Sequence, residues 1–257
     1  MKIAVPREIK NNEYRVAITP AGVHEFTTRG HEVFVEADAG AGSSIPDEDY
    51  LAAGAKVLPN AEDVWAEGQL VLKVKEPIAE EYPRLRRDQV LFTYLHLAAS
   101  AELTDAMLDS GVTGIAYETV QTANGSLPLL APMSEVAGRL APQVGAYSLM
   151  RPSGGRGVLP GGVPGVHPAR VVVIGGGVAG LNAARVALGM GADVELLDTN
   201  VDKLREIDRD FHGQIRTVTS NRYTVEQAVR AADLVIGAVL IPARRPRSWC
   251  PTTWCRR

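Results

Sequence analysis

A glycine-rich turn in the second half of the chain has the residues and spacing that dinucleotide phosphates require. A β-branched run at 171–174 predicts a buried strand, and an alanine-rich helical pattern begins directly after the turn. Between them stands the motif Gly175-Gly176-Gly177-Val178-Ala179-Gly180. In G-x-G-x-x-G between strand and helix, the first glycine permits the tight turn, the second lets the backbone approach a pyrophosphate, and the third lets helix and strand pack closely. The helix N-terminus adds free N–H groups for the phosphates.

A carboxylate stands where the ribose of such a nucleotide would be held. Residues 193–198 predict the next strand, which ends at Asp198, 18 residues after Gly180. In dinucleotide-binding proteins with this motif, an acidic residue about 20 residues further along the chain binds the ribose 2′-OH. Because a carboxylate repels a 2′-phosphate, NAD is favoured over NADP. The alternative is a glycine turn of another α/β protein, such as a flavin or S-adenosylmethionine binder.

Three basic side chains in the first half follow predicted strands. They are Arg15, Lys75 and His96, associated with strands at 3–5, 70–75 and 90–95. In open α/β sheets, ligands bind outside the carboxyl ends of the strands. A guanidinium can clamp a carboxylate, an ammonium can polarise a carbonyl, and an imidazole can pass a proton near neutral pH. Together they suit a small anionic keto acid.

Lys73 limits this interpretation. It lies on the same face of its predicted strand as Lys75, and nothing in the sequence separates the roles of the two lysines. A basic residue at a strand end is commonly a solvated surface group, so that second interpretation stays open.

Alternating strands and helices must position these residues. In the first half, periodicity predicts strands at 3–5, 31–36, 70–75, 90–95 and 114–118, with helices at 20–29, 47–53 and 101–110. Ser134 predicts the cap of a helix that runs to about residue 150 with a kink at Pro142, and the Gly/Pro-rich segment 151–168 predicts a loop. The second half predicts strands at 171–175, 193–198, 215–219 and 233–238, with helices at 178–190, 200–209 and 224–232.

This alternation is typical of an α/β protein with parallel sheets. We expect two Rossmann-like domains: an N-terminal substrate (catalytic) domain at 1–128 and an NAD-binding domain at 129–242. The second supplies four predicted strands where the doubly wound fold normally has six, so we expect an incomplete doubly wound domain.

Composition excludes several classes of protein. The chain has 257 residues, 46% of them hydrophobic and 22% charged, which is typical of a soluble globular protein. It has no apolar run of about 20 residues that could span a membrane, and its start lacks a signal-peptide pattern. With a net charge of −3 and no basic stripe, no nucleic-acid partner is expected. The lack of a membrane span and of a signal-peptide pattern leads us to expect a cytoplasmic protein. No His/Cys cluster has metal-ligand spacing, so we expect no metal site.

Residues 243–257 do not continue the pattern. Both cysteines of the chain, Cys250 and Cys255, lie there, and two cysteines alone make no tetrahedral metal site. One back-translation into GC-rich codons, read one base earlier, gives GAKAPKLVPDDLV, which resembles the continuation of a dinucleotide-binding domain in a known family. We therefore expect an out-of-frame tail produced by a frameshift and an early stop.

From Met1 to about Pro242 the chain resembles the alanine dehydrogenases. The resemblance is carried by six stretches: IAVPREIK at 3–10, EYRVAITP at 13–20, KVKEP at 73–77, YLHLA at 94–98, PMSEVAG at 132–138 and the glycine motif. Related families are the nucleotide-binding alpha subunit of proton-translocating transhydrogenase and, more distantly, the saccharopine dehydrogenases.

The resemblance implies NAD-dependent oxidative deamination of L-alanine to pyruvate and ammonia, and the reverse amination. It implies that Arg15 and Lys75 bind the substrate carboxylate and carbonyl, and that Lys75 and His96 are catalytic, with His96 as the acid/base. Hydride loss from Cα would give an imine, water would add, and ammonia would leave. The implied cofactor contacts are Ser134, Gly175, Gly177, Val178, Ala179, Gly180, Asp198, Lys203, Ser220, Val239 and Leu240. A homo-hexamer is the family's assembly.

The resemblance also implies that about the last third of a family chain is absent, including the last strands and a catalytic aspartate. We therefore expect the polypeptide as written to be poorly soluble and inactive. Two alternatives remain: a subunit similar to the transhydrogenase alpha subunit, and a non-catalytic NAD-binding remnant.

Overall fold

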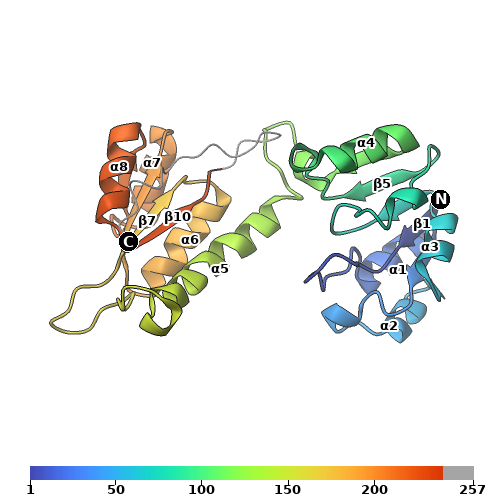
Figure 1. Cartoon of the computed structure of the whole chain (residues 1–257), viewed down its shortest axis with the longest axis horizontal. Helices are drawn as coiled ribbons and strands as arrows, with labels where there is room; N and C mark the ends of the chain where they lie inside the picture. Colours follow the sequence, from blue (N-terminus) through green and yellow to red (C-terminus); the bar gives the residue numbers. More distant parts are fainter. Residues whose placement is uncertain (240–257) are drawn as a thin grey trace. The chain divides into compact units, whose positions relative to one another are not determined.

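The computed structural model describes residues 1–239, which form two compact units, Met1–Leu129 and a second that begins at Leu130 (Figure 1). Each unit has its own parallel sheet. The expected tail at 243–257 and the expected cofactor contact Leu240 lie outside the described residues.

Within Met1–Leu129, six parallel strands form one sheet in the order β3-β2-β1-β4-β5-β6. The strands are β1 (Lys2–Val5), β2 (Glu32–Glu36), β3 (Lys56–Leu58), β4 (Leu70–Leu72), β5 (Val90–Thr93) and β6 (Thr113–Ala116). In β1, Ala4 pairs with Phe34 of β2 on one side and Val71 of β4 on the other. This is the complete order of the doubly wound fold, and it confirms the expected Rossmann-like domain.

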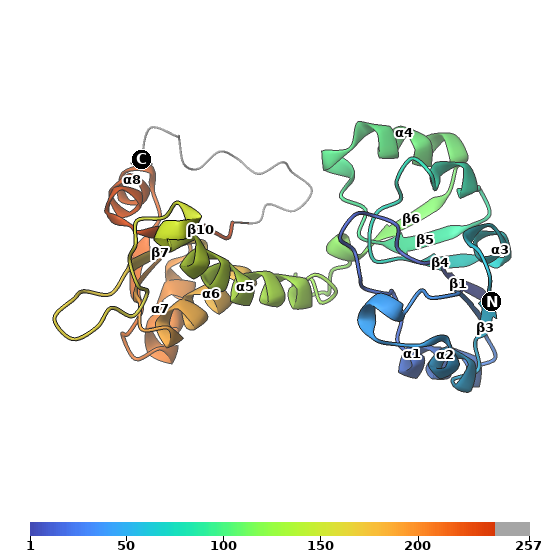
Figure 2. The ribbon, with the colours of Figure 1, turned by 60° about the horizontal axis from the view of Figure 1, so that its bottom comes forward.

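Helices cover both faces of this sheet (Figure 2). They are α1 (Pro20–Thr28), α2 (Asp47–Ala52), α3 (Ala61–Glu67) and α4 (Ala101–Ser110). Residues alternate along β1: Ile3 and Val5 face the core with α1 and α2, whereas Ala4 faces the core with α3 and α4. Thr19 caps α1 and Pro20 occupies its first turn, as the sequence predicts.

Two predicted strands of this unit end too late, and two short elements were not predicted. The strand expected at 70–75 ends at Leu72, because the N–H groups of Val74 and Lys75 turn to the Glu8 carboxylate. The strand expected at 90–95 ends at Thr93, because Glu118 takes the N–H of Leu95. Short elements β3 and α3 escaped prediction, since three and seven residues show little periodicity.

Among the described residues of the second unit, four parallel strands have the order β10-β7-β8-β9. They are β7 (Arg170–Ile174), β8 (Asp193–Asp198), β9 (Arg216–Thr219) and β10 (Leu234–Gly237). The helices are α5 (Ala131–Leu149), α6 (Val178–Gly189), α7 (Val201–Asp210) and α8 (Arg222–Ala231). The strand order corresponds to strands 3-2-1-4 of a doubly wound sheet, which is the predicted topology.

Helix α5 begins earlier than predicted. Ser134 lies inside the helix and donates its N–H to the carbonyl of Leu130, because Pro132 fits the first helical turn. The helix continues through Pro142 and packs closely on α6, where a Cβ added to Gly138 would lie 2.2 Å from the carbonyl oxygen of Ala179.

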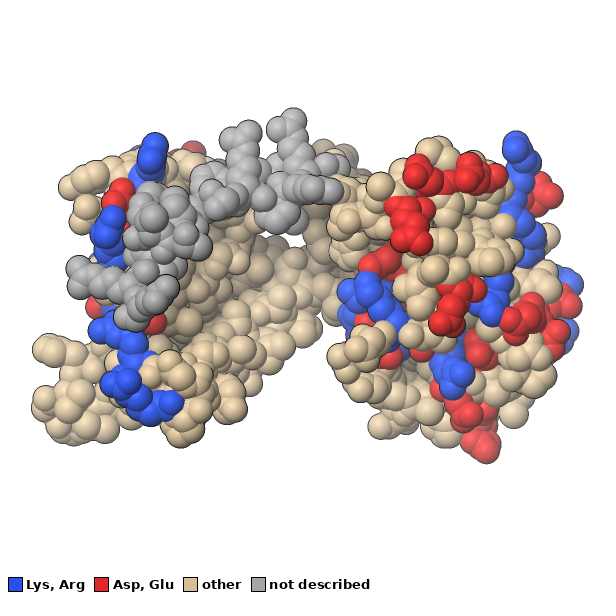
Figure 3. Space-filling view, viewed as in Figure 1, with Lys and Arg blue, Asp and Glu red and all other residues tan. Residues whose placement is uncertain are grey.

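The exposed face of α5 is apolar. Val136, Leu140, Val144 and Tyr147 follow one another at helical spacing, and each is more than half exposed. Figure 3 shows an uncharged surface over this helix, whereas acidic and basic side chains intermingle over Met1–Leu129 on the same view. None of the helices within residues 1–239 combines the length and apolarity needed to cross a bilayer.

Candidate active site

The carboxyl edge of the first sheet carries the three basic residues predicted from the sequence. β1 and β4 are neighbours in the sheet although β2 and β3 come between them in the chain, so the strand order reverses there. Ligands of doubly wound sheets bind at such a switch point. Arg15 lies in the loop after β1, Lys75 follows β4, and His96 follows β5.

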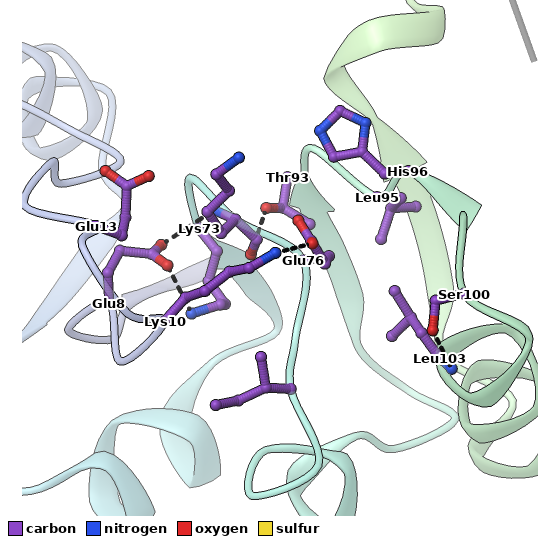
Figure 4. A network of polar contacts seen from close by, with 12 residues as sticks. Glu8, Lys10, Glu13, Lys73, Glu76, Thr93, Leu95, His96, Ser100 and Leu103 are labelled. Carbon is purple, nitrogen blue, oxygen red and sulfur yellow. Dashed lines mark hydrogen bonds and ion pairs between the residues drawn. The ribbon is translucent and has the colours of Figure 1, made fainter. Parts of the chain in front are cut away.

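A chain of contacts joins these side chains. The Glu13 carboxylate is hydrogen-bonded to Arg15 and lies within electrostatic reach of Lys75. The Tyr94 hydroxyl lies within electrostatic reach of the Arg15 guanidinium, and the Tyr94 ring stacks on His96 with centroids 5.9 Å apart and planes 9° apart. Figure 4 shows Glu13 and His96 on opposite sides of Lys73 and Thr93. The structure therefore brings Arg15, Lys75 and His96 together at one edge.

The Arg15 guanidinium is held in a fork by Glu13. Its Nε donates to Oε1 at 2.7 Å and its Nη2 donates to Oε2 at 2.6 Å. These hydrogen bonds lower the pKa of Glu13 and raise the pKa of Arg15, so both groups stay charged. The pairing fixes the plane in which the guanidinium can meet a carboxylate. Sequence reasoning missed Glu13 as a partner, although its position two residues before Arg15 was a usable signal.

The structure separates the two lysines that the sequence left equivalent. Lys73 is 1% exposed, and its Nζ forms ion pairs with Glu8 at 3.2 Å and Glu81 at 2.8 Å. Burial raises the pKa of the Glu8 carboxyl, and Lys73 offsets only part of that effect. Lys75 is half-buried and forms no ion pair within residues 1–239. Lys73 is therefore a structural cation, and Lys75 is the one available to a ligand.

His96 is held by its neighbours on the sheet. Its backbone is left-handed, with φ of 48°, and its N–H donates to Oε1 of Glu118 at 2.6 Å. Its Nδ1 lies 3.8 Å from the same oxygen, and the imidazole is 44% exposed. Glu118 follows β6, the strand next to β5, and it was not among the residues predicted from the sequence. Because β6 and β5 end at the same edge, the adjacent strand end was the signal that could have found it.

The glycine turn of the second unit has the three steric properties predicted for it. Gly175 has φ of +104°, and a Cβ there would lie 2.8 Å from the carbonyl oxygen of Ala238. A Cβ on Gly180 would lie 1.7 Å from the carbonyl oxygen of Gly175, so only glycine permits this contact between helix and strand. A Cβ on Gly177 would meet nothing within 4 Å, which leaves an open backbone surface at the N-cap of α6.

Asp198 closes the other side of this turn. Its Oδ2 accepts the N–H of Gly176 at 2.7 Å, and its Oδ1 accepts the N–H of Asn200 at 2.8 Å. The Nζ of Lys203 lies 3.7 Å from Oδ2. Burial alone would raise the pKa of Asp198, but the two N–H donors and Lys203 outweigh it, so the pKa is lowered and the group stays ionised.

The other expected cofactor positions lie on elements around the turn. Ser220 follows β9 and donates its N–H to the carbonyl of Asp198. A methyl group of Val239 lies 3.1 Å from the Cβ position of Gly175. Val178 and Ala179 begin α6, and Ser134 is a half-buried residue of α5. Across residues 1–239, no three or more His, Cys, Asp or Glu side chains gather as a metal site.

Asp198→Asn should change the acid stability of the second unit. The pKa of Asp198 in the folded state lies below its ordinary value of 3.8. The ionised carboxylate therefore stabilises the fold above pH 3.8, and this stabilisation is lost as the pH falls through the pKa of the folded state. We expect the difference in Tm between wild type and variant to be largest near neutral pH and to shrink below about pH 4. Thermal unfolding followed by circular dichroism measures this, and a pH-independent difference would contradict it.

The chain matches two domain families over most of its length. They are "Alanine dehydrogenase/PNT, N-terminal domain" over residues 4–137 and "Alanine dehydrogenase/PNT, C-terminal domain" over residues 141–249. The second match ends inside the segment expected to be out of frame.

Named relatives point the same way. An alanine dehydrogenase of Mycobacterium tuberculosis is 66% identical over 248 residues, which are 96% of this chain and 67% of the relative. An alanine dehydrogenase of Mycolicibacterium smegmatis is 65% identical with the same coverage. Thus the chain spans about two thirds of the length of these relatives.

Solved structures resemble the chain as well. An L-alanine dehydrogenase has a TM-score of 0.90 at 51% identity, covering 99% of this chain and 70% of that one. A transhydrogenase from Sinorhizobium meliloti has a TM-score of 0.78 at 30% identity, covering 95% of this chain and 71% of that one. Both similarities cover the two units described above.

Proposed function

Because the chain belongs to the alanine dehydrogenase/PNT family, we propose that its residues serve the NAD-dependent oxidative deamination of L-alanine to pyruvate and ammonia, and the reverse amination. The observation that carries this proposal is the gathering of Arg15, Lys75 and His96 at one sheet edge. The chain spans about two thirds of its relatives' length, so the proposal concerns the steps that its described residues can perform.

Arg15 and Lys75 have the chemistry to hold a 2-oxo acid. A guanidinium oriented by Glu13 presents N–H donors in a fixed plane, which suits a carboxylate. The Lys75 ammonium, free of ion pairs within residues 1–239, supplies a second positive charge for the carboxylate or carbonyl oxygen. Lys73 cannot do this, since its ammonium is buried between two carboxylates.

His96 is the proposed proton carrier. An imidazole both donates and accepts protons near neutral pH, as water addition to an imine and departure of ammonia require. Its partial exposure lets it exchange protons with a bound substrate. In this role His96 would deprotonate the attacking water and then protonate the leaving amine.

The glycine turn fits a dinucleotide. The open backbone surface at Gly177 is where a pyrophosphate could approach, and the N-terminus of α6 would stabilise its charge. Asp198, kept ionised at the turn, would accept a hydrogen bond from the ribose 2′-OH. When bound, NAD supplies the acceptor for the hydride that leaves Cα of alanine.

Two further family properties are part of the proposal. A homo-oligomer, a hexamer in the family, is supported by the exposed apolar face of α5, since contiguous apolar surface of this kind favours association. Cytoplasmic location is proposed from the small, polar substrate and cofactor. Between the two solved relatives, the higher identity to the L-alanine dehydrogenase favours deamination over a transhydrogenase function.

The cofactor preference is directly testable. We expect the 257-residue chain to bind NADH at least about 10-fold more tightly than NADPH, because the Asp198 carboxylate repels a 2′-phosphate. Calorimetric titration of both nucleotides measures this, with Asp198→Ala as the variant that should reduce the preference. Equal affinities in the wild type would contradict the assignment of Asp198.

An assay of alanine turnover distinguishes a dehydrogenase from a non-catalytic NAD-binding chain. Alanine-dependent formation of NADH, followed at its absorbance band, supports the dehydrogenase and would show the expected inactivity to be wrong. Binding of NADH and pyruvate without turnover supports the non-catalytic alternative for this chain. Loss of pyruvate binding in Lys75→Met, with NADH binding retained, tests the substrate edge separately from the glycine turn.

A further inference from the structure

The loop that carries His96 has a backbone conformation that needs support. His96 has φ of 48° and ψ of 35°, in the left-handed region. For a residue with a side chain this conformation is unfavourable, because Cβ lies too close to the following carbonyl oxygen. Such a residue persists where its surroundings determine it strongly, and that is common at functional sites.

The Glu118 carboxylate supplies this support. It accepts the His96 N–H at 2.6 Å and lies 3.2 Å from the Leu95 N–H through both oxygens. Only 18% of its side chain is exposed. Because β5 and β6 are paired up to Thr93 and Ala116, the carboxylate reaches the loop from the turn that directly follows the neighbouring strand.

The imidazole is oriented from two sides. Its Nδ1 faces Glu118, with 3.8 Å between Nδ1 and Oε1. Its ring is stacked on Tyr94, whose hydroxyl donates to the carbonyl of Leu129 at 2.7 Å. Nε2 is separated from Nδ1 by Cε1, so its lone pair points in a different direction from that of Nδ1. Glu118 and Tyr94 are the titratable groups that these contacts place against the imidazole.

We infer that Glu118 is a positioning residue for His96, which sets both the backbone of its loop and the tautomer of its ring. A carboxylate beside Nδ1 favours the proton on that nitrogen, which leaves the lone pair on Nε2. Nε2 is then the atom that takes and returns protons at the substrate. The inference rests on the proposed function of His96, which Glu118 serves without touching the substrate.

A merely structural role for Glu118 makes a different prediction. If the carboxylate only accepted the two backbone N–H groups, an amide oxygen would replace it and the ring tautomer would not change. Glu118→Gln therefore separates the two roles, because the amide keeps an acceptor of the same reach and loses the negative charge.

The test is the ¹⁵N spectrum of the histidine rings in the 257-residue chain. At about pH 8.5 free imidazole is neutral, and the two nitrogens of a neutral ring give distinct shifts. His96→Gln identifies the His96 signals by their loss. We expect the Nδ1–H form to predominate at His96 in the wild type, and Glu118→Gln to remove that preference. Glu80→Gln, a change at an exposed carboxylate of the same unit, should leave the spectrum unchanged.

The outcomes are separable. An Nε2–H tautomer at His96 in the wild type overturns the inference, whether or not Glu118→Gln folds. An unchanged tautomer in a folded Glu118→Gln variant also overturns it and leaves Glu118 as a loop cap. If the tautomer responds as expected but His96→Gln leaves pyruvate binding in the presence of NADH unchanged, the proposed role of His96 at the substrate fails while the coupling of Glu118 to His96 stands.

Discussion

Gly180→Ala is expected to unfold the second unit at temperatures at which the wild type is folded. The added Cβ would lie 1.7 Å from the carbonyl oxygen of Gly175, and that atom belongs to the backbone, so no side chain can move aside. Relief requires α6 to shift away from β7, which opens the core around Val171, Val173 and Ala183. We expect a loss of about 3 kcal/mol or more in the free energy of unfolding, the upper range for an overpacked core.

Hydrogen exchange of peptides from β7 and β8 measures this loss without interference from the first unit. The matched control is Gly189→Ala in the same helix, where a Cβ meets nothing within 4 Å. Gly177→Ala is the second control: it should keep the fold and weaken NADH binding, because its methyl group would occupy the open backbone surface. Equal protection in the Gly180 and Gly189 variants would refute the steric argument.

The glycine turn could be predicted from sequence because its requirements are local. Strand, turn and helix are contiguous, and each glycine acts on atoms brought near by the same motif. Asp198 was predictable for a related reason. In this motif the helix that connects β7 to β8 has a regular length, so the end of β8, at Asp198, lies beside the glycine turn. The four-strand order of the second unit followed from the alternation of strands and helices.

The partners at the substrate edge could not be predicted in this way. Glu8 and Lys73 are 65 residues apart, and Glu118 is 22 residues from His96. Their meeting depends on which strands are neighbours in the sheet and on where each strand ends. Sequence periodicity places strand ends only to within a few residues. Strands β4 and β5 both end earlier than predicted, because the Glu8 and Glu118 carboxylates accept backbone N–H groups that would otherwise continue the strand pairing.

Lys73→Met should destabilise the first unit by about 3–5 kcal/mol, the usual cost of removing one partner from a buried ion pair. Methionine has a similar shape, so the core stays filled. The Glu8 and Glu81 carboxylates would then face each other without the cation that lies 3.2 Å and 2.8 Å from them. Lys75→Met should cost less than about 1 kcal/mol, since Lys75 is half-buried and forms no ion pair within residues 1–239.

The pH dependence of the Lys73→Met variant identifies the cause of its instability. The folded-state pKa of Glu8 is already raised above its ordinary value of 4.5 by burial, and removing Lys73 removes an influence that lowers it. When folding raises the pKa of a carboxyl group, its protonated form stabilises the folded state. This stabilisation is complete below the pKa of the unfolded state and is lost as the pH rises through the pKa of the folded state. The deficit of the variant should therefore be larger at about pH 7 than at about pH 4.5. Urea unfolding measures it, followed by tryptophan fluorescence in a chain whose Trp249 and Trp254 are replaced by phenylalanine, so that Trp65 is the reporter. A deficit independent of pH would point to packing rather than to the unpaired carboxylates.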